Sequence, residues 1–380
     1  MEKKTQEAPK RKKVLFLAQH FITLYSFRRE LIERLAAEGH EVVLSLPESE
    51  DNSYFTKLGC RIVSTDIDRR GINPLKDLKL ISFYRRMIPR ENPDLVLSYT
   101  IKPNVYGALA LRGKRRPDGQ AFRQICNITG TGGTFLENNL VAKICRLLYR
   151  HSVKRAYKVF FQNTGDRDMF LRYGMVGKQN YDMLPGSGVN LDQFHTVPLP
   201  EGDEVNFIFM GRVMKLKGMD EFLEAARIIR REYPNTRFWI AGFIEEGEYK
   251  EKVASYEADG SVVALGFQKN IVSWIEKSHC TILPSHGGEG VPNVLLETAA
   301  MGRICIGSRI AGTEDVIDDG KTGYLFTAGD TEDLVRAIRK VLALTPEERT
   351  AMGLAGRAKV EREFDRRQVV EKYMREVELA

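Results

Sequence analysis

Short apolar runs alternate with segments of helical periodicity along most of the chain. Short continuous apolar runs between polar turns predict buried strands, and apolar residues that recur every three or four positions predict helices. The predicted strands occupy 14–18, 41–46, 61–65, 94–99, 123–129, 158–163, 205–210, 237–241, 262–266, 280–283, 304–307 and 324–326. The predicted helices include 27–37, 75–88, 140–157, 220–232, 271–277, 292–301 and 334–343. Strands separated by helices are typical of a mostly parallel sheet with helices on both faces.

This alternation occurs twice, which predicts two domains in the 380 residues. We expect an α/β protein of two facing, doubly wound Rossmann-like domains, which bind their ligand in the cleft between the carboxyl ends of both sheets. The expected organisation is a basic, disordered leader at 1–13, a first domain at 14–194, a second domain at 195–364, and a helix at 365–380 that crosses back to the first domain.

Charge is distributed unevenly between the two halves of the chain. The formal net charge is +7, but residues 1–190 hold 33 Lys and Arg against 19 Asp and Glu, and the remainder holds 25 against 32. Nucleic acid, an anionic membrane face or a phosphate-bearing substrate would each account for the basic half. No apolar run approaches the ~20 residues that a membrane-spanning helix needs. The five scattered cysteines include Cys126, Cys280 and Cys305 in predicted strands, which indicates reduced core thiols.

The clearest chemistry lies in a glycine-rich segment with two carboxylates, Glu289 and Glu297, eight residues apart. Gly288 and Gly290 flank the first carboxylate, and Pro292 suits the first turn of the helix that follows. A strand, a glycine loop and a helix N-terminus together aim backbone N–H groups at an anion. A sugar nucleotide supplies both the anion and hydroxyls for the carboxylates. The alternatives for Glu289 are an exposed loop carboxylate or a first-turn charge that favours the helix dipole. Glu297 is expected in mid-helix among leucines and alanines, where a buried carboxylate needs a partner, and a ribose diol would supply one.

A second motif follows the first strand of the second domain. Gly211, Arg212, Lys217 and Gly218 stand at a predicted strand-to-helix turn. There Arg212 can bind two phosphate oxygens in bidentate fashion, and Lys217 can act as a point charge. Surface cations on an ordinary loop are the alternative, but the glutamate motif in the same domain favours a diphosphate clamp.

Together these motifs resemble the retaining glycosyltransferases of the GT-B fold, and within them family 4. The resemblance covers nearly the whole chain. Its matching positions are Gly188, Val189, Asn190, Gly211, Arg212, Lys217, Gly218, Glu289, Glu297, Gly312, Thr313, Glu314, Asp319, Gly320 and Gly323.

The resemblance implies a donor site in the second domain. Arg212 and Lys217 would hold the donor pyrophosphate, Glu297 the ribose hydroxyls, and Glu289 would face the donor sugar. Glu289, Arg212 and Lys217 are therefore the candidate catalytic residues. Further donor contacts are expected from Gly211, Gly288, Gly290, Val291, Pro292 and Phe267. The implied reaction is metal-independent substitution on one face of a UDP-sugar, in which the departing phosphate takes the acceptor proton.

Motifs in the first domain resemble the bacterial branch of the family that extends undecaprenyl-diphosphate-linked sugars, including N-acetylgalactosaminyltransferases. They comprise Tyr25–Arg28, Arg69–Pro74, Ser98–Asn104 and Thr129–Gly133. The resemblance implies a polyprenyl-diphosphate-linked acceptor and a position on the cytoplasmic face of the cell membrane. The candidate acceptor residues are His20, Arg28, Arg69, Lys102, Asn104, Thr129 and Gly130. Each candidate cation has a competing interpretation as a generic surface charge.

The segment 143–158 is the best candidate for contact with an anionic membrane surface. Arg146, Arg150 and Lys154 are spaced to share one face of a helix. An ordinary solvated helix face is the alternative.

Several features depart from the family or mislead. The first strand-to-helix loop, 19–25, lacks the glycine pair of many members, so His20 is a candidate for a replacement polar contact. Asp66 with Asp68, and Asp166 with Asp168, match the short D-x-D metal pattern, but such patterns arise by chance, and we expect no catalytic metal. The loop 130–133 is better interpreted as a close approach over the cleft than as a dinucleotide fingerprint.

Three other functions compete with lipid-linked transfer. One is a sugar-nucleotide epimerase on the same fold, and another is a transferase with a soluble acceptor. The third is a nucleic-acid-binding protein, which is disfavoured because the second half is acidic and no recognition motif is present.

Overall fold

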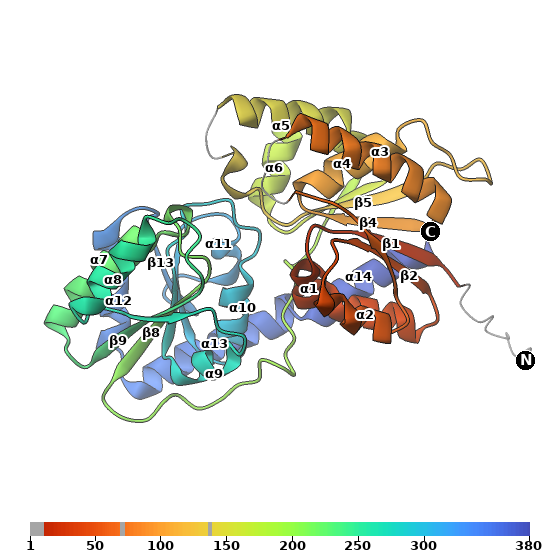
Figure 1. The fold of residues 1–380 in the computed structure, drawn as a ribbon. Helices are drawn as coiled ribbons and strands as arrows, with labels where there is room; N and C mark the ends of the chain where they lie inside the picture. Colours follow the sequence, from red (N-terminus) through yellow and green to blue (C-terminus); the bar gives the residue numbers. More distant parts are fainter. Residues whose placement is uncertain (1–10, 69–72, 136–138) are drawn as a thin grey trace, which may run out of the picture.

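The computed structural model describes residues 11–68, 73–135 and 139–380. Its chain forms two parallel sheets, one in each domain (Figure 1). The first sheet has the order β3-β2-β1-β4-β5-β6-β7, and every neighbouring pair is parallel. Its strands are β1 Lys13–Leu17, β2 Glu41–Leu46, β3 Arg61–Ser64, β4 Leu95–Tyr99, β5 Arg123–Ile128, β6 Lys158–Phe161 and β7 Tyr181–Met183.

The second sheet has the order β10-β9-β8-β11-β12-β13 and is also parallel. Its strands are β8 Val205–Met210, β9 Thr236–Ala241, β10 Val263–Gly266, β11 Cys280–Leu283, β12 Ile304–Ser308 and β13 Gly323–Phe326. The strand order reverses between β8 and β11, and ligands of open α/β sheets bind beyond the carboxyl ends of the strands at such a point. The two doubly wound sheets confirm the predicted fold class.

Helices cover both sheets. Those of the first domain are α1 Phe21–Ala37, α2 Ser53–Lys57, α3 Pro74–Glu91, α4 Ile101–Leu111, α5 Leu140–His151 and α6 Thr164–Arg172. Those of the second are α7 Met219–Glu232, α8 Tyr249–Ala258, α9 Val272–Lys277, α10 Asn293–Ala300, α11 Thr313–Val316, α12 Thr331–Ala343 and α13 Pro346–Glu363. The helix predicted at 27–37 begins at Phe21 instead, because the His20 side chain caps it by accepting a hydrogen bond from the Ile22 N–H.

The last helix, α14 Arg366–Glu378, returns from the second domain and packs against the first (Figure 1). Val369, Tyr373 and Val377 belong to the same apolar core as Phe16 of β1. The Tyr373 ring stands edge-on to Phe160, with ring centroids 5.3 Å apart. The first domain therefore buries its core with residues from the far end of the chain.

Several elements lie outside the predicted ranges, and one helix is shorter than expected. The elements without a predicted counterpart are β7, α2, α4, α6, α8, α11 and α13, and the helix predicted at 140–157 ends at His151. The cysteines are free thiols, of which Cys145 alone among the five is not buried. Within the described residues, no helix combines the length and the apolar character needed to cross a membrane.

Candidate functional site

Residues of the predicted donor site lie at the carboxyl end of β11. The loop after this strand carries Glu289, whose carboxylate accepts a hydrogen bond of 2.7 Å from the Ser285 hydroxyl and forms an ion pair with Lys217. Helix α10 begins at Asn293, so Pro292 occupies the N-cap position rather than the first turn that the sequence suggested. We call the segment between β11 and α10, residues 284–292, the glutamate loop. Its ion pair with Lys217 joins it to the loop between β8 and α7, which we call the cation loop.

The cation loop connects β8 to α7 and packs directly on the glutamate loop. Gly218 has φ +70°, and a Cβ placed there would lie 1.9 Å from the carbonyl oxygen of Pro284. Only glycine permits this approach. The His286 N–H also donates to the Leu216 carbonyl oxygen at 2.9 Å. These contacts bring the Lys217 ammonium to Glu289, although the two residues are far apart in sequence.

Arg212 stands at the open side of the same loop. Its Nη1 lies 3.5 Å from a carboxylate oxygen of Glu245, and its side chain remains 40% exposed. Such a long ion pair is weak. The guanidinium is therefore accessible to an anionic ligand.

Glu297 lies on α10 in the same domain, and it is only partly accessible. Burial raises the pKa of this carboxyl to about 7, even though the guanidinium of Arg366 opposes the shift. Among the described residues, none donates a hydrogen bond to its carboxylate. A half-buried carboxylate without protein donors is suited to accept hydroxyl protons from a ligand.

Glycine loops from the two domains meet beside Glu289. The Gly132 N–H donates to the Gly288 carbonyl oxygen at 3.0 Å. Gly130 has φ +102°, and a Cβ there would lie 2.6 Å from the Gly290 nitrogen. A Cβ on Gly290 would in turn lie 2.8 Å from the carbonyl oxygen of Thr129. The predicted close approach of loop 130–133 is confirmed, and it spans the two domains.

The first domain also holds the glutamate loop through Asn163, which the sequence analysis did not select. Its side-chain amide donates to the carbonyl oxygens of Glu289 at 3.1 Å and Gly290 at 3.4 Å. The same amide donates to Asp166, which also accepts a longer hydrogen bond of 3.4 Å from Thr131. Burial raises the pKa of Asp166 to about 6.

The sequence contains a local signal for Asn163 and Asp166. Asn163 follows an apolar run and precedes a helix, as expected of an N-cap residue, and it does cap α6. Asp166 was set aside as half of a chance D-x-D pattern. Its partner Asp168 is exposed and pairs with Arg167. Within the described part of the chain, no group of three or more potential metal ligands occurs.

Two candidate acceptor residues lie in the interior of the first domain. Arg28 is buried, with its guanidinium over the rings of Tyr99 at 4.9 Å and Tyr373 at 5.4 Å. The interpretation of Arg28 as a surface cation is therefore wrong, because two aromatic rings enclose it. Asn104 is also buried, and its amide donates to the Asn127 carbonyl oxygen at 2.8 Å. Both residues have structural partners that account for them.

The other first-domain candidates are more open. Lys102, at the start of α4, forms an ion pair of 2.8 Å with Asp77 of α3. His20 uses its Nδ1 to cap α1. Arg69 lies outside the described residues. The roles of these residues toward an acceptor remain predictions.

The remaining donor candidates lie in the loops that follow β8, β10 and β11 in the second domain. Gly211 follows β8, and its carbonyl oxygen would lie 1.7 Å from a Cβ on Gly242. Val291 is buried beneath the glutamate loop. Phe267 follows β10 and is exposed.

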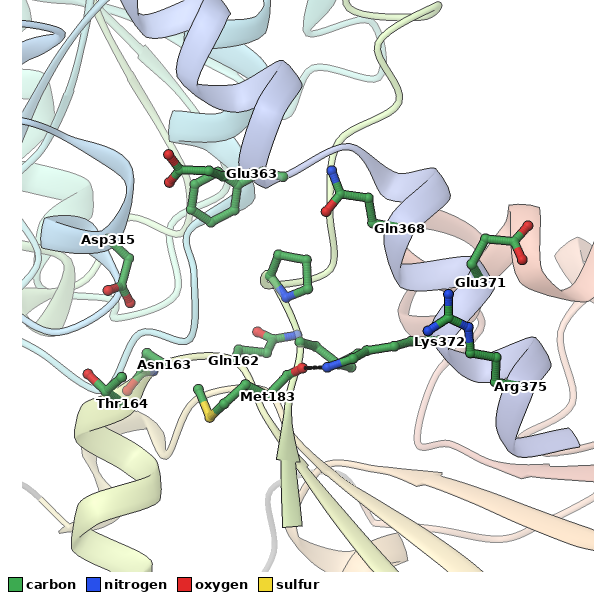
Figure 2. A pocket seen from close by; sticks show the side chains of 13 residues that line it. Gln162, Asn163, Thr164, Met183, Asp315, Glu363, Gln368, Glu371, Lys372 and Arg375 are labelled. Atoms are coloured by element: carbon green, nitrogen blue, oxygen red, sulfur yellow. Dashed lines mark hydrogen bonds between the residues drawn. The ribbon is translucent and has the colours of Figure 1, made fainter. Parts of the chain in front are cut away.

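A separate cavity of about 690 Å³ lies along the seam between the domains (Figure 2). It is bordered by the ends of β6 and β7, by α11, and by the junction of α13 with α14. Lys372 of α14 reaches the carbonyl oxygen of Met183 there (Figure 2). As far as the chain is described, its lining includes none of the predicted donor residues.

Known proteins resemble this chain in sequence over nearly its whole length. A family model described as glycosyl transferases group 1 matches residues 204–343, and one described as glycosyl transferase 4-like domain matches residues 26–186. The N,N'-diacetylbacillosaminyl-diphospho-undecaprenol alpha-1,3-N-acetylgalactosaminyltransferase of Campylobacter jejuni is 24% identical, over 95% of this chain and 96% of the relative. The UDP-Gal:alpha-D-GlcNAc-diphosphoundecaprenol alpha-1,3-galactosyltransferase of Escherichia coli is 25% identical over 72% of each chain.

Solved structures share the fold. A glycosyltransferase from Rickettsia africae superposes with a TM-score of 0.77 at 17% identity, covering 97% of this chain and 98% of that one. Anabaena HepE in complex with UDP and glucose gives 0.78 at 15% identity, covering 97% of this chain and all of that one. The two matched domain families agree with the paired parallel sheets, and the chain belongs to the family 4 glycosyltransferases of the GT-B fold.

Proposed function

We propose that this protein is a retaining transferase that moves a hexose or N-acetylhexosamine from a UDP-sugar to an undecaprenyl-diphosphate-linked sugar. The product would enter a bacterial surface glycan or a glycoprotein glycan. The observation that carries the donor side is the joining of two loops: Lys217, on the loop that also carries Arg212, forms an ion pair with Glu289, on the loop that leads into α10 and Glu297.

The donor would lie with its diphosphate against the cation loop. As the anomeric bond breaks, charge develops on the leaving diphosphate, and Arg212 and Lys217 would stabilise it. Glu297 would accept hydrogen bonds from the ribose. Glu289 would face the sugar, held by Ser285 from below and through its backbone by Asn163 of the other domain. Departing phosphate and attacking hydroxyl would share one face of the sugar, and the phosphate would take the acceptor proton without a metal ion.

The acceptor side rests on the relatives and on charge. The Campylobacter jejuni and Escherichia coli relatives are named for diphospho-undecaprenol substrates. The excess of Lys and Arg in the first half suits a diphosphate-bearing lipid at an anionic membrane surface. We place the enzyme at the inner face of the cell membrane as a peripheral protein.

A soluble acceptor is the second candidate. One relative, the N-acetyl-alpha-D-glucosaminyl L-malate synthase of Bacillus anthracis, is 24% identical over 90% of each chain, and its name indicates a malate acceptor. An epimerase on the same fold is a further alternative, and it would leave the nucleotide attached to the sugar.

A panel of UDP-sugars offered with undecaprenyl-diphosphate-linked monosaccharides tests the proposal, with free UDP and product mass as the readouts. Lipid product together with stoichiometric UDP is the expected result. UDP release that requires malate or another small acceptor would establish the second candidate. Conversion of the UDP-sugar without UDP release would establish an epimerase.

Replacing Glu289 with Gln tests the roles that we propose for Glu289 and for the diphosphate clamp. We expect turnover to fall by about 100-fold or more, because the carboxylate facing the sugar is lost while the diphosphate clamp remains. UDP binding by calorimetry should persist in this variant. Arg212→Ala should instead weaken UDP binding by roughly 1.5–3 kcal/mol, the value of a charge-assisted hydrogen bond. Glu251→Gln, an exposed change on α8, is the control, and a turnover as low as that of Glu289→Gln would contradict the assignment.

A further inference from the structure

Helix α5 presents apolar side chains away from the protein. Leu140, Val141, Ile144 and Leu147 are 71%, 43%, 49% and 55% exposed. Leu140, Ile144 and Leu147 recur at helical spacing, so they form one continuous stripe. A helix on a globular protein normally turns such a stripe toward the core.

The opposite side of α5 already supplies the core contact. Ala142 and Tyr149 are the buried residues of this helix. Tyr149 packs edge-on against Phe170, with ring centroids 4.9 Å apart. The exposed stripe is therefore an additional apolar surface, and the fold of this domain does not use it.

Helix α3 extends this surface. Leu75 and Leu78 in its first turns are 72% and 62% exposed. Helix α4 packs against both α3 and α5, so the exposed leucines of α3 belong to the same layer of helices as the stripe of α5. We refer to Leu75, Leu78, Leu140, Val141, Ile144 and Leu147 together as the apolar face.

The charges on the α5 side of the apolar face are basic. Helix α5 contains Lys143, Arg146, Arg150 and His151 and no acidic residue, and Lys143 is exposed next to the leucines. On the α3 side the charges are mixed, because Lys79 borders a pocket together with Asp66 and Asp68. The Asp77 carboxylate on α3 is paired with Lys102. An apolar stripe with a basic rim complements the interface of an anionic bilayer, where acyl chains lie beneath phosphate headgroups.

This arrangement corrects the sequence-based expectation for the segment 143–158. Arg146 stacks on the Tyr173 ring at 4.2 Å, and the Arg150 guanidinium donates to the Tyr173 carbonyl oxygen. Lys154 lies beyond the end of α5 in a 3₁₀ turn. The three cations do not share one helix face, so the apolar stripe is the better contact surface.

We propose that the apolar face is the membrane-docking surface of this protein, with its leucines, valine and isoleucine inserted among the lipids and Lys143 at the headgroups. The partner is an anionic bilayer. The biological role of this surface rests on the proposed function, but the binding itself requires neither donor nor acceptor.

Co-sedimentation of the full chain with lipid vesicles tests the proposal. Vesicles of phosphatidylethanolamine with phosphatidylglycerol should bind the wild type, and vesicles of phosphatidylcholine alone should bind it less. The double variant Ile144→Glu/Leu147→Glu should lower the partition coefficient about tenfold or more, because two charged groups would enter the hydrocarbon edge. Leu354→Glu, a change at a 46% exposed leucine on α13, is the matched control and should bind as the wild type does.

Unchanged melting temperature and UDP binding would show that the double variant is folded. Wild-type binding by this variant would overturn the proposal. A change of oligomeric state in sedimentation velocity, with vesicle binding retained, would also overturn it and would make the apolar face a subunit interface. Loss of vesicle binding in the variant, when no UDP-sugar yields product with the wild type, would leave the docking surface standing and reject the proposed function alone.

Discussion

Burial of the Glu297 carboxyl favours its neutral form, but its proposed contact with a ribose favours the ionised form. Its carboxylate lies among apolar residues of α10, and burial raises its pKa to about 7 from an ordinary value of 4.5. The ionised form is nevertheless the one that can accept hydrogen bonds at every lone pair. Keeping this carboxyl ionised costs stability in the free protein.

The titration of Glu297 predicts opposite effects of pH on stability and on binding. Because the folded pKa exceeds the unfolded one, unfolding releases a proton between pH 4.5 and about 7, and the stability contributed by this group falls as pH rises through that window. Glu297→Gln removes the proton release. Its melting temperature relative to the wild type should therefore be higher at pH 8 than at pH 5.

UDP should bind more tightly when Glu297 is ionised. The ratio of wild-type to Glu297→Gln affinity should decrease as pH falls below about 7, and the titration of UDP itself cancels in this ratio. Isothermal titration at several pH values measures it. A ratio that is constant between pH 5 and pH 8 would remove the carboxylate from the nucleotide site.

At the scale of elements, the loops after β5 and β11 determine how closely the domains approach. Gly130 and Gly288 each lie where a Cβ would meet the backbone of the other domain. Neither loop can accept a side chain at these positions without a shift of the backbone. The seam beside Glu289 is therefore built from main-chain atoms.

Gly130→Ala should separate these loops and reduce activity strongly. The added Cβ would lie 2.6 Å from the Gly290 nitrogen, and φ +102° is unfavourable for alanine by roughly 1–2 kcal/mol. Transfer rate and the radius of gyration in solution with UDP report the effect. Gly133→Ala is the control, since its nearest neighbour is a leucine methyl at 3.6 Å, and the two variants should differ clearly. Equal rates would show that closure of this seam is not needed.

The sequence allowed the strands, most helices and the donor loops to be predicted, because apolar periodicity and glycine spacing are local properties. Strand β7 was missed because its three residues, Tyr181–Met183, are all half-buried and carry no continuous apolar run. Helix α13 was missed because its apolar residues do not gather on one face. The burial of Arg28 and the bond from Asn163 to Glu289 depend on contacts between distant segments, which spacing along the chain does not encode.

For the whole molecule, Arg366 connects the start of α14 to the first domain. Its Nη1 donates to both carboxylate oxygens of Glu30 of α1, at 3.0 and 3.1 Å, and its Nη2 donates to the Gly188 carbonyl oxygen at 2.9 Å. The side chain is buried at the start of α14. This single residue therefore fixes where α14 enters the first domain.

Arg366→Met should destabilise the protein by roughly 3 kcal/mol, because it leaves a largely buried carboxylate and a carbonyl oxygen without their donor. Urea unfolding followed by circular dichroism measures the change. Arg367→Met, at the exposed neighbouring position, should remain within about 0.5 kcal/mol of the wild type. Similar losses in both variants would show that α14 as a whole, rather than this ion pair, carries the effect.

Because α14 packs against the first domain, it also constrains the order in which the two domains can fold during synthesis on the ribosome. The second domain has its strands between Val205 and Phe326 and takes core residues from α12 and α13 as far as Phe364, so it can fold once that continuous segment has emerged. The first domain is translated earlier, yet part of its core, including Tyr373 and Val377, is translated after the second domain. Phe16 and Phe160 cannot complete their packing until these partners have been synthesised. The core of the first domain is therefore begun first and completed after that of the second domain.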